Sequence, residues 1–322
     1  MSFKFYLFLI VAFILLALVA VSSGGASISL GDIVKFFTFG ELDETKQLIL
    51  TQMRLPRLVL GILIGALLAT SGVVVQSVFL NPLADPYIIG IASAATFGAV
   101  IAYLLGLSDV FYGIFAFLAA SGLSLVIFKL AAHTRSISTL LIVGIAVSSF
   151  LGAFTSFAVY LIGEDSFRIT AWMMGYLGGA NWQKIALLLP PLLFCMAYFY
   201  AKRHELNIIL NGDEEAKSLG LNVEKSKKSL LIVSSLIIGF SVAFTGMIGF
   251  VGLIIPHTLR MALHTASNAV LIPASALTGG VFLVFCDVIA KNALSPVEIP
   301  IGVVTSFFGA PFFLYLAFRK HA

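Results

Sequence analysis

Apolar runs separated by short polar turns make up most of the chain. They cover residues 5–21, 58–80, 87–107, 110–131, 139–162, 185–201, 229–250, 269–290 and 301–318. A helix needs about 20 apolar residues to cross a bilayer core, and backbone in lipid must be helix or closed barrel. Barrel strands are only about 10 residues long. The pattern therefore predicts an all-α, polytopic membrane protein with one transmembrane domain over residues 1–322.

A tenth apolar segment, residues 251–263, is only half as long. It follows the glycines Gly246 and Gly249 and contains Pro256, so we expect an interrupted helix that is broken at the proline. Such breaks occur at membrane depth only where protein or a cavity surrounds them. His257 beside the break is more simply explained as a structural hydrogen-bonding group than as a metal ligand. No second ligand lies near it in the sequence.

The distribution of basic residues sets the orientation. If all ten segments cross and both termini are cytoplasmic, twelve of the 19 Lys and Arg residues lie inside and seven outside. Basic residues accumulate on the cytoplasmic side of membrane proteins. Nine crossings would leave Arg319 and Lys320 outside, against this rule. We therefore expect about ten transmembrane helices with both termini in the cytoplasm.

Composition narrows the class further. The chain is 60% hydrophobic and 11% charged, against about 25% charged residues in soluble domains. Its net charge of +4 comes from short loops between the apolar runs and predicts no nucleic-acid partner. Cys195 and Cys286 lie within apolar runs and show no disulfide or metal spacing. The N-terminal run, 5–21, is longer than a usual signal peptide core and is interpreted as a retained first helix.

Residues 210–228 form the one long polar stretch, which the charge distribution places in the cytoplasm. Its composition predicts a short helix between two spans, available to a partner protein. The acidic residues Asp213, Glu214 and Glu215 could contact that partner or stabilise the N-terminus of a helix. Lys225, Lys227 and Lys228 would serve mainly as the positive anchor of the next span.

Several other residues are candidates for function or packing. Arg54 and Arg57 flank Pro56 at the start of the second span, as interfacial anchors or as exposed external cations for an acidic partner. Asp287 is the acid well inside a span, and Lys291 could pair with it at the i, i+4 spacing. The pattern Gly61-x-x-x-Gly65 favours close helix packing.

Enzymatic and ion-coupled functions find little support. The chain has no Gly-x-x-x-x-Gly-Lys-Ser/Thr sequence and so no P-loop for ATP. It has no His-Glu-x-x-His motif or carboxylate dyad, so we expect no catalytic or metal site. A secondary transporter, the alternative hypothesis, needs intramembrane proton or ion relays, and Asp287 alone qualifies.

Five motifs, in order along nearly the whole chain, resemble the permease subunits of bacterial ABC importers for iron-siderophores, haem and vitamin B12. They are Arg54-Leu55-Pro56-Arg57, Asn81-Pro82-Leu83-Ala84-Asp85-Pro86, Trp172-Met173-Met174-Gly175, Ile248-Gly249-Phe250-Val251-Gly252-Leu253-Ile254-Ile255-Pro256-His257 and Glu298-Ile299-Pro300-Ile301-Gly302-Val303-Val304-Thr305.

The resemblance implies an importer in the bacterial cytoplasmic (inner) membrane. It implies a homodimer with the path at its interface, two ATPase subunits that bind ATP and Mg²⁺, and a periplasmic or lipid-anchored binding protein. No cofactor is expected in this chain itself. Alternating access would move the substrate. A ferric siderophore or haem is favoured over cobalamin by family frequency alone.

The resemblance also assigns roles to residues. Arg54, Arg57 and Lys291 match positions that dock the binding protein, while Ile137 and Ser138 match an inner gate. Arg168 matches a basic position near the outer end of the path. A coupling segment over residues 205–228 would contact the ATPase through Asp213, Glu214, Glu215, Ala216, Lys217, Ser218, Leu219 and Gly220.

Overall fold

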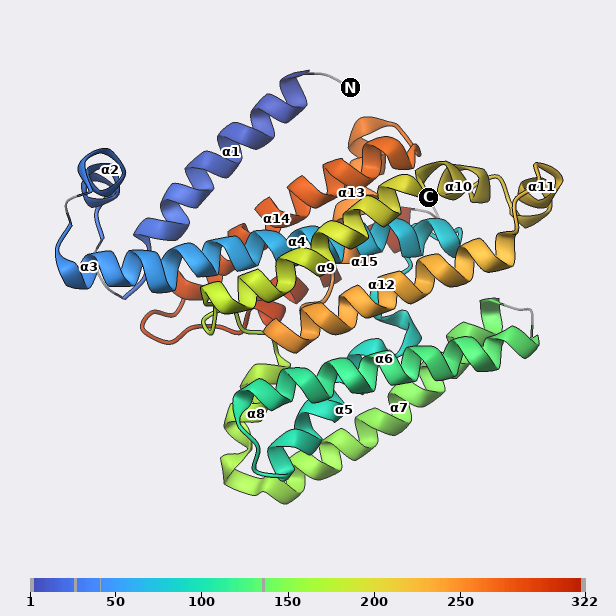
Figure 1. The fold of residues 1–322 in the computed structure, drawn as a ribbon, viewed down its shortest axis with the longest axis horizontal. Helices are drawn as coiled ribbons and strands as arrows, with labels where there is room; N and C mark the ends of the chain where they lie inside the picture. The colour runs from blue at the N-terminus through green and yellow to red at the C-terminus, as the bar shows by residue number, and fades with distance from the viewer. Residues whose placement is uncertain (1–2, 26–27, 41, 135–136, 320–322) are drawn as a thin grey trace.

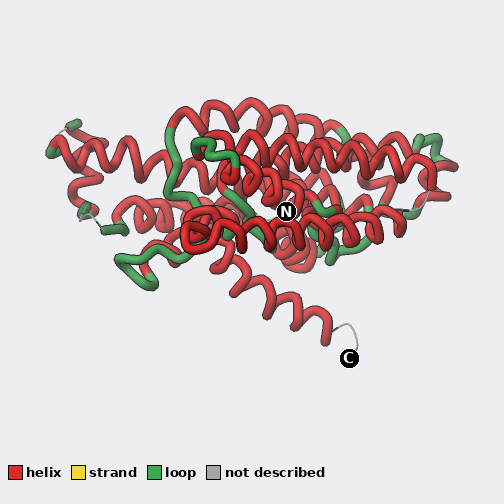
Figure 2. The backbone as a smooth tube through the Cα atoms, turned by 90° about the horizontal axis from the view of Figure 1, so that it is seen from below, coloured by secondary structure: helices red, strands yellow, loops and turns green. Residues whose placement is uncertain are grey.

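The computed structural model describes residues 3–25, 28–40, 42–134 and 137–319. Every regular element in these ranges is a helix, which confirms the all-α prediction (Figure 2). The α-helices are α1 (Phe3–Ser22), α2 (Leu30–Phe39), α3 (Glu44–Leu48), α4 (Leu55–Val78), α5 (Ile91–Leu104), α6 (Asp109–Thr134), α7 (Ile137–Ile162), α8 (Phe167–Met173), α9 (Trp182–Ala201), α10 (Arg203–Ile209), α11 (Asp213–Ser218), α12 (Val223–Thr245), α13 (Val251–Leu263), α14 (Asn268–Asn292) and α15 (Ile301–Arg319).

The apolar helices correspond to the segments expected from the sequence. In the described ranges, six helices are long and apolar enough to cross a membrane, and four shorter apolar helices match the remaining segments. The shorter ones are Leu9–Ser22, Ile91–Leu104, Val251–Leu263 and Ile301–Tyr315. A polytopic membrane protein is thereby confirmed. The exact number of crossings and the side of each terminus stay predictions.

The helices form two groups, with α12 of the first packed against α6 of the second (Figure 1). One group contains α4, α9, α12, α13 and α14, and the other contains α5 to α8. Helices α4 and α14 approach so closely that a Cβ on Gly65 would lie 2.2 Å from the backbone oxygen of Gly279. Gly65 therefore permits backbone-to-backbone contact, as its spacing from Gly61 predicted.

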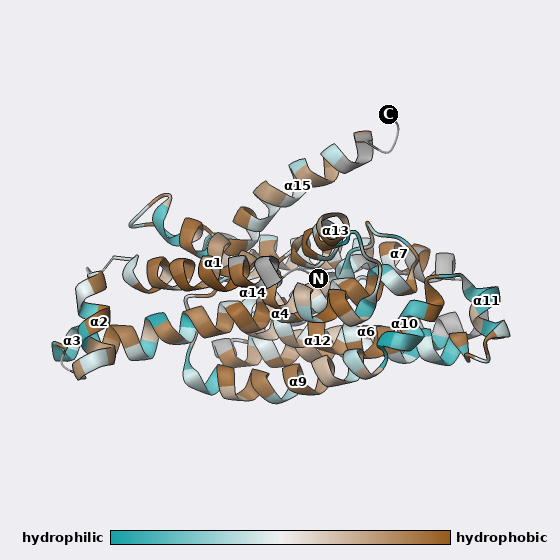
Figure 3. Cartoon of the chain, turned by 90° about the horizontal axis from the view of Figure 1, so that it is seen from above, coloured by the Kyte–Doolittle hydropathy of each residue, from teal (hydrophilic) through white to brown (hydrophobic). Residues whose placement is uncertain are grey.

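Polar residues gather at opposite ends of the long axis (Figure 3). Helices α2 and α3 lie at one end, and α10 and α11 lie at the other, with apolar helices between them. We call these the outer end and the inner end, following the orientation expected from the basic residues. The opposite placement of these polar regions suits a protein that contacts water on both sides of a membrane.

The outer start of the second span is more regular than expected. A π-helix, η1 (Ile49–Arg54), joins α3 directly to α4, so one continuous helical segment runs from Glu44 to Val78. Pro56 lies in the first turn of α4, as predicted, but the helical segment continues before it through η1, so this proline does not mark a free helix end.

The expected interruption of the tenth segment is displaced from Pro256. The chain breaks at residues 246–250, where Gly246 and Phe250 have φ of 68° and 67°, and α13 then runs through Pro256. A proline leaves the carbonyl four residues earlier without its helical donor. Here Gln76 Nε2 donates to that carbonyl, the oxygen of Gly252, at 3.2 Å, and to Leu253 O at 3.1 Å. The prediction of a break at Pro256 is therefore wrong, because another helix satisfies the exposed carbonyl.

Candidate functional site

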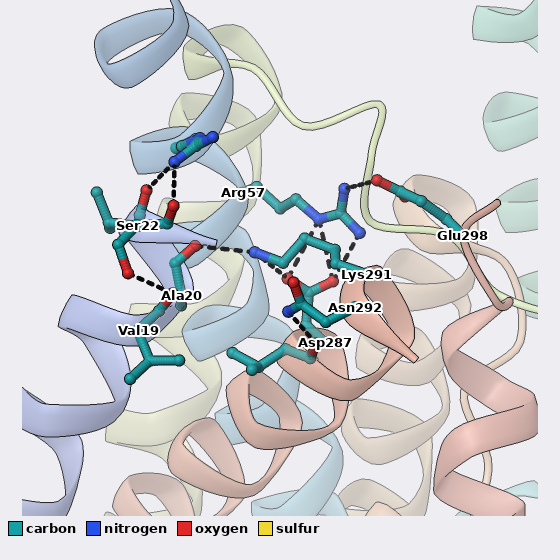
Figure 4. Close-up of polar contacts among 11 residues, drawn as sticks. Val19, Ala20, Ser22, Arg57, Asp287, Lys291, Asn292 and Glu298 are labelled. Atoms are coloured by element: carbon teal, nitrogen blue, oxygen red, sulfur yellow. Dashed lines mark hydrogen bonds and ion pairs between the residues drawn. The ribbon is translucent and has the colours of Figure 1, made fainter. Parts of the chain in front are cut away.

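An ionic cluster lies at the outer end, where α4 meets α14 (Figure 4). Arg57 Nη2 lies 2.9 Å from Asp287 Oδ1, and Arg57 Nε donates to the same carboxylate at 3.0 and 3.2 Å. Arg57 Nη1 donates to Glu298 Oε1 at 2.9 Å. The guanidinium thus bridges two carboxylates, with a forked contact to the more buried one.

Lys291 completes the cluster and ties it to α1. Its Nζ lies 3.3 Å from Asp287 Oδ2 and donates to the backbone oxygen of Ala20 at 2.9 Å. The predicted i, i+4 pair with Asp287 is therefore confirmed. Both residues are buried, with 9% and 3% of their surfaces exposed. Two cations, Arg57 and Lys291, face two carboxylates, so the charges in this cluster balance.

The sequence places these groups together through helix packing. Arg57 lies in the first turn of α4 and Asp287 in the last turns of α14, and the two helices run side by side. Glu298 comes from the loop after α14 and remains 35% exposed at its side chain. Sequence spacing could identify the Lys291 pair, but neither Arg57–Asp287 nor Arg57–Glu298 has a local signal.

Arg54 is separate from this cluster. Its Nη1 donates to the backbone oxygens of Val21 and Ser22, the latter at 2.8 Å, and only 9% of the residue is exposed. The side chain thus fastens the end of α1 to α4. The exposure expected for Arg54 and Arg57 is not found. Backbone carbonyls of the same chain bind Arg54, and carboxylates of the same chain bind Arg57. The docking role of Arg54, Arg57 and Lys291 stays a prediction.

At the inner end, α10 is anchored in the protein. Leu206 and Ile209 are fully buried. Asn207 Oδ1 accepts hydrogen bonds from Asn268 N at 2.8 Å and from Asn268 Nδ2 at 3.0 Å. Asn268 Oδ1 in turn accepts from Ser77 Oγ at 3.1 Å. These bonds connect α10 to α14 and α4, the two helices that carry the outer cluster.

Glu205 adds a connection from α10 to α12. It accepts from Lys202 Nζ at 2.5 Å and from Ser226 Oγ at 2.6 Å. Burial would raise the pKa of Glu205, but these two donors outweigh it, and the pKa lies below its usual value. The carboxylate is therefore held ionised between the two helices.

Helix α11 presents one face inward and one outward. Ala216 is fully buried, and Asp213 pairs with Lys227 on α12 at 2.6 Å. The acidic start of the polar stretch is thus divided, with Asp213 turned to α12. Lys227 is 6% exposed and pairs with Asp213, so it fastens α11 to α12. Its role as a positive anchor of the next span stays a prediction. The remaining predicted coupling residues are exposed: Glu214, Glu215, Lys217, Ser218, Leu219 and Gly220.

The predicted path residues lie elsewhere. Ile137 and Ser138 are at the start of α7, and their side chains fall outside the described part of the chain. Arg168 is an exposed residue of α8, a short helix that contacts α5. The predicted gate role of Ile137 and Ser138 and the predicted path role of Arg168 therefore stay predictions.

Comparison with known proteins gives a consistent result. Residues 9–319 match the model of the FecCD transport family. The cobalamin import system permease protein of Halobacterium salinarum is 43% identical over 278 residues, covering 85% of this chain and 74% of that protein. The hemin transport system permease protein of Yersinia pestis is 35% identical and covers 97% of this chain and 95% of its own length.

Solved structures support the same fold. A metal-chelate type ABC transporter in an inward-facing conformation superimposes with a TM-score of 0.87 at 31% identity, over 98% of this chain and 99% of that chain. A chain of the PsaBC complex from Streptococcus pneumoniae gives a TM-score of 0.57 at 17% identity, over 88% of this chain and 94% of that chain. The second likeness concerns the fold alone.

Proposed function

This chain belongs to the FecCD transport family and is a transmembrane permease subunit of an ABC importer, and we propose that its two polar ends dock the other components. The alternative of a secondary transporter is not supported, because the relatives are ABC permeases. In addition, Asp287, the relay candidate of that alternative, is held by Arg57 and Lys291.

The inner end is the proposed contact with the ATPase. The observation that carries this proposal is the exposed face of α11 together with Leu219, the residue directly after it, which has 61% of its surface in solvent. Exposed apolar residues within a polar surface are typical of protein contacts. Two ATPase subunits would bind ATP and Mg²⁺ and move α11, and this chain would need no cofactor of its own.

The predicted mechanism is alternating access. Movement of α11 would reach α10 and then, through Asn207 and Asn268, α14 and α4. Because those helices end at the outer ionic cluster, the same connection would link the ATPase to a docked binding protein. An acidic group on a periplasmic or lipid-anchored binding protein would compete there with Glu298 for Arg57.

Co-purification tests the ATPase contact. The variant Glu215→Arg changes an exposed side chain and should fold and insert normally but lose the ATPase subunit and uptake. Gly220 is left unchanged because its φ of 84° disfavours any side chain. Unchanged association and uptake would refute the assignment of α11. Uptake that survives ATP depletion and collapses with an uncoupler would instead point to an ion-driven transporter.

The substrate is proposed to be a bulky metal chelate: a ferric siderophore, haem or cobalamin. The named relatives transport cobalamin and hemin, which favours a tetrapyrrole-type chelate over the siderophore. Uptake of each radiolabelled compound, with the cognate binding protein and ATPase in proteoliposomes, would decide among them. Competition by an unlabelled siderophore but not by haem or cobalamin would overturn the preference.

We further propose a homodimer in the bacterial cytoplasmic membrane. Exposed aromatic residues on α15, including Phe307 and Phe318 at 78% and 75% exposure, are available to a second copy or to lipid. Native mass spectrometry of the importer should show two copies of this chain. A single copy per complex would exclude the homodimer.

A further inference from the structure

A cavity of about 380 Å³ opens at the inner end, beside the start of α11. Its walls come from the end of α4, the link between α10 and α11, and the last turn of α13. The lining residues are Gln76, Leu80, Asn81, Pro82, Leu210, Asn211, Gly212, Arg260 and Ala266. The cavity is thus partly apolar and partly polar, with one charged group.

That charged group, Arg260, has a neutral partner only. Its Nη1 donates to Gln76 Oε1. The Gln76 amide nitrogen is committed to the carbonyls of Gly252 and Leu253, and this orientation turns the amide oxygen toward Arg260. Among the residues that the structure describes, no carboxylate forms an ion pair with Arg260. A guanidinium has five N–H donors, so most of its hydrogen-bonding capacity is free for a ligand.

Three other partly or fully buried cations have a counter-charge within the chain. Arg57, Lys227 and Lys291 each lie within 3.3 Å of a carboxylate oxygen. Removing a cation from water without a counter-charge is unfavourable. Arg203 is also half-buried with neutral partners, but Arg260 lines an open cavity, where an anion from outside the chain can reach its free donors.

We infer that this cavity receives a carboxylate side chain of the ATPase subunit, which pairs with Arg260. The inference rests on the proposed contact between α11 and the ATPase. Gly212 lines the cavity and directly precedes α11, so a protein seated on α11 also covers the cavity mouth. The amides of Asn81 and Asn211 can donate to the incoming carboxylate, while Leu80 and Leu210 pack against its methylene groups. A planar guanidinium matches a carboxylate in two parallel hydrogen bonds.

A zero-length cross-link tests the pairing in the assembled importer. Arg260→Lys keeps the charge and adds an amine, which a water-soluble carbodiimide joins to a carboxylate only when the two are in contact. We expect an amide bond between Lys at this position and one acidic residue of the ATPase, located by mass spectrometry. Arg260→Gln should lack this product. Arg203→Lys is the matched control, because Arg203 also has neutral partners at the inner end, stacked on Tyr200, but lies outside the cavity.

Binding measurements then test the energetics. Arg260→Glu should weaken ATPase binding by about 30-fold or more, since it breaks a desolvated ion pair. Reversal of the cross-linked acid to Arg should restore it. A cross-link to an acid of this chain, or no cross-link in an intact complex, would overturn the inference.

Two further outcomes have separate meanings. If inorganic phosphate or vesicles containing phosphatidylglycerol stabilise the isolated permease but not Arg260→Gln, the cavity holds a phosphate and the inference is wrong. If Arg260 variants bind the ATPase normally while Leu219→Glu does not, the inference fails and the proposed function stands. If neither the Arg260 variants nor Leu219→Glu weaken ATPase binding, both the inference and the proposed ATPase contact are wrong.

Discussion

Arg57 on α4 and Asp287 on α14, 230 residues apart in the sequence, are joined by a 2.9 Å ion pair at the outer end. Asp287 also contacts Lys291, so one carboxylate contacts both cations of the cluster. Its removal leaves Lys291 with only the carbonyl of Ala20. The integrity of this end of the protein therefore depends on Asp287.

Asp287→Asn should lower the free energy of unfolding by about 3–5 kcal/mol, the usual cost of removing one partner of a buried pair. Thermal unfolding in detergent measures the change. Asp32→Asn removes the charge from a half-exposed pair between Asp32 and Lys46, in which Asp32 also belongs to the capping box of α2. It is the control and should cause a smaller drop, because water screens this pair. Equal stability of Asp287→Asn and the wild type would show that the cluster is not structural.

The sequence predicted those features that depend on local spacing. The apolar segments, the pair of Lys291 with Asp287 and the exposed helix in the polar stretch follow from periodicities that neighbouring residues set. The partners of Arg57 and Lys227 could not be predicted in this way. They depend on the register between helices, which side-chain packing decides, and no spacing rule connects residues from different helices.

The interruption near Pro256 illustrates the same limit. A proline predicts a break because it removes one helical hydrogen bond. The structure compensates with Gln76, whose position opposite Gly252 depends on the packing of α4 against α13. A rule for one helix therefore fails when a second helix supplies the missing donor.

The two glycines of the Gly61-x-x-x-Gly65 pattern should respond differently to substitution. A Cβ on Gly65 would meet backbone atoms of Gly279 at 2.2 Å, whereas on Gly61 its nearest neighbour is a Val284 methyl group at 3.5 Å. Backbone cannot move aside as a side chain can. Gly65→Ala should therefore destabilise the protein by about 1–3 kcal/mol, and Gly61→Ala should be close to neutral.

Thermal unfolding and the yield of monodisperse protein measure this difference. The two variants add the same methyl group to the same helix, so helix propensity is matched between them. If both variants behaved alike, the close contact between α4 and α14 would not be present in the membrane.

Leu219, directly after α11, is the residue that should contribute most to ATPase binding. Leu219→Glu places a charge in the proposed contact and should weaken ATPase association by about 2 kcal/mol or more, as expected at an interface hot spot. Because the side chain is exposed, thermal stability of the isolated permease should not change. Glu224→Ala, an exposed change in the first turn of α12, should leave binding unaltered. Because Leu219→Glu adds a negative charge and Glu224→Ala removes one, weakened binding by both variants would mean that the effect is not specific to Leu219.

Gln76 and Pro256 should be energetically coupled, although they lie on different helices. Gln76→Ala leaves the carbonyls of Gly252 and Leu253 without their donor, and an unsatisfied buried carbonyl costs about 1–3 kcal/mol. Pro256→Ala restores an N–H that can bond to Gly252 O within α13. The double variant should therefore be more stable than the sum of the two single changes predicts.

A double-mutant cycle of thermal unfolding measures this coupling, which should lie between about 0.5 and 3 kcal/mol. In a control cycle, Gln76→Ala is combined with Pro273→Ala, in α14, instead of Pro256→Ala. Gln76 makes no hydrogen bond to that part of the chain. Coupling to Pro256 but not to Pro273 would establish that Gln76 lets α13 continue through its proline. Strict additivity with Pro256 would mean that the carbonyl of Gly252 is satisfied by water instead, and that α13 owes its continuity to the solvent in the adjoining cavity.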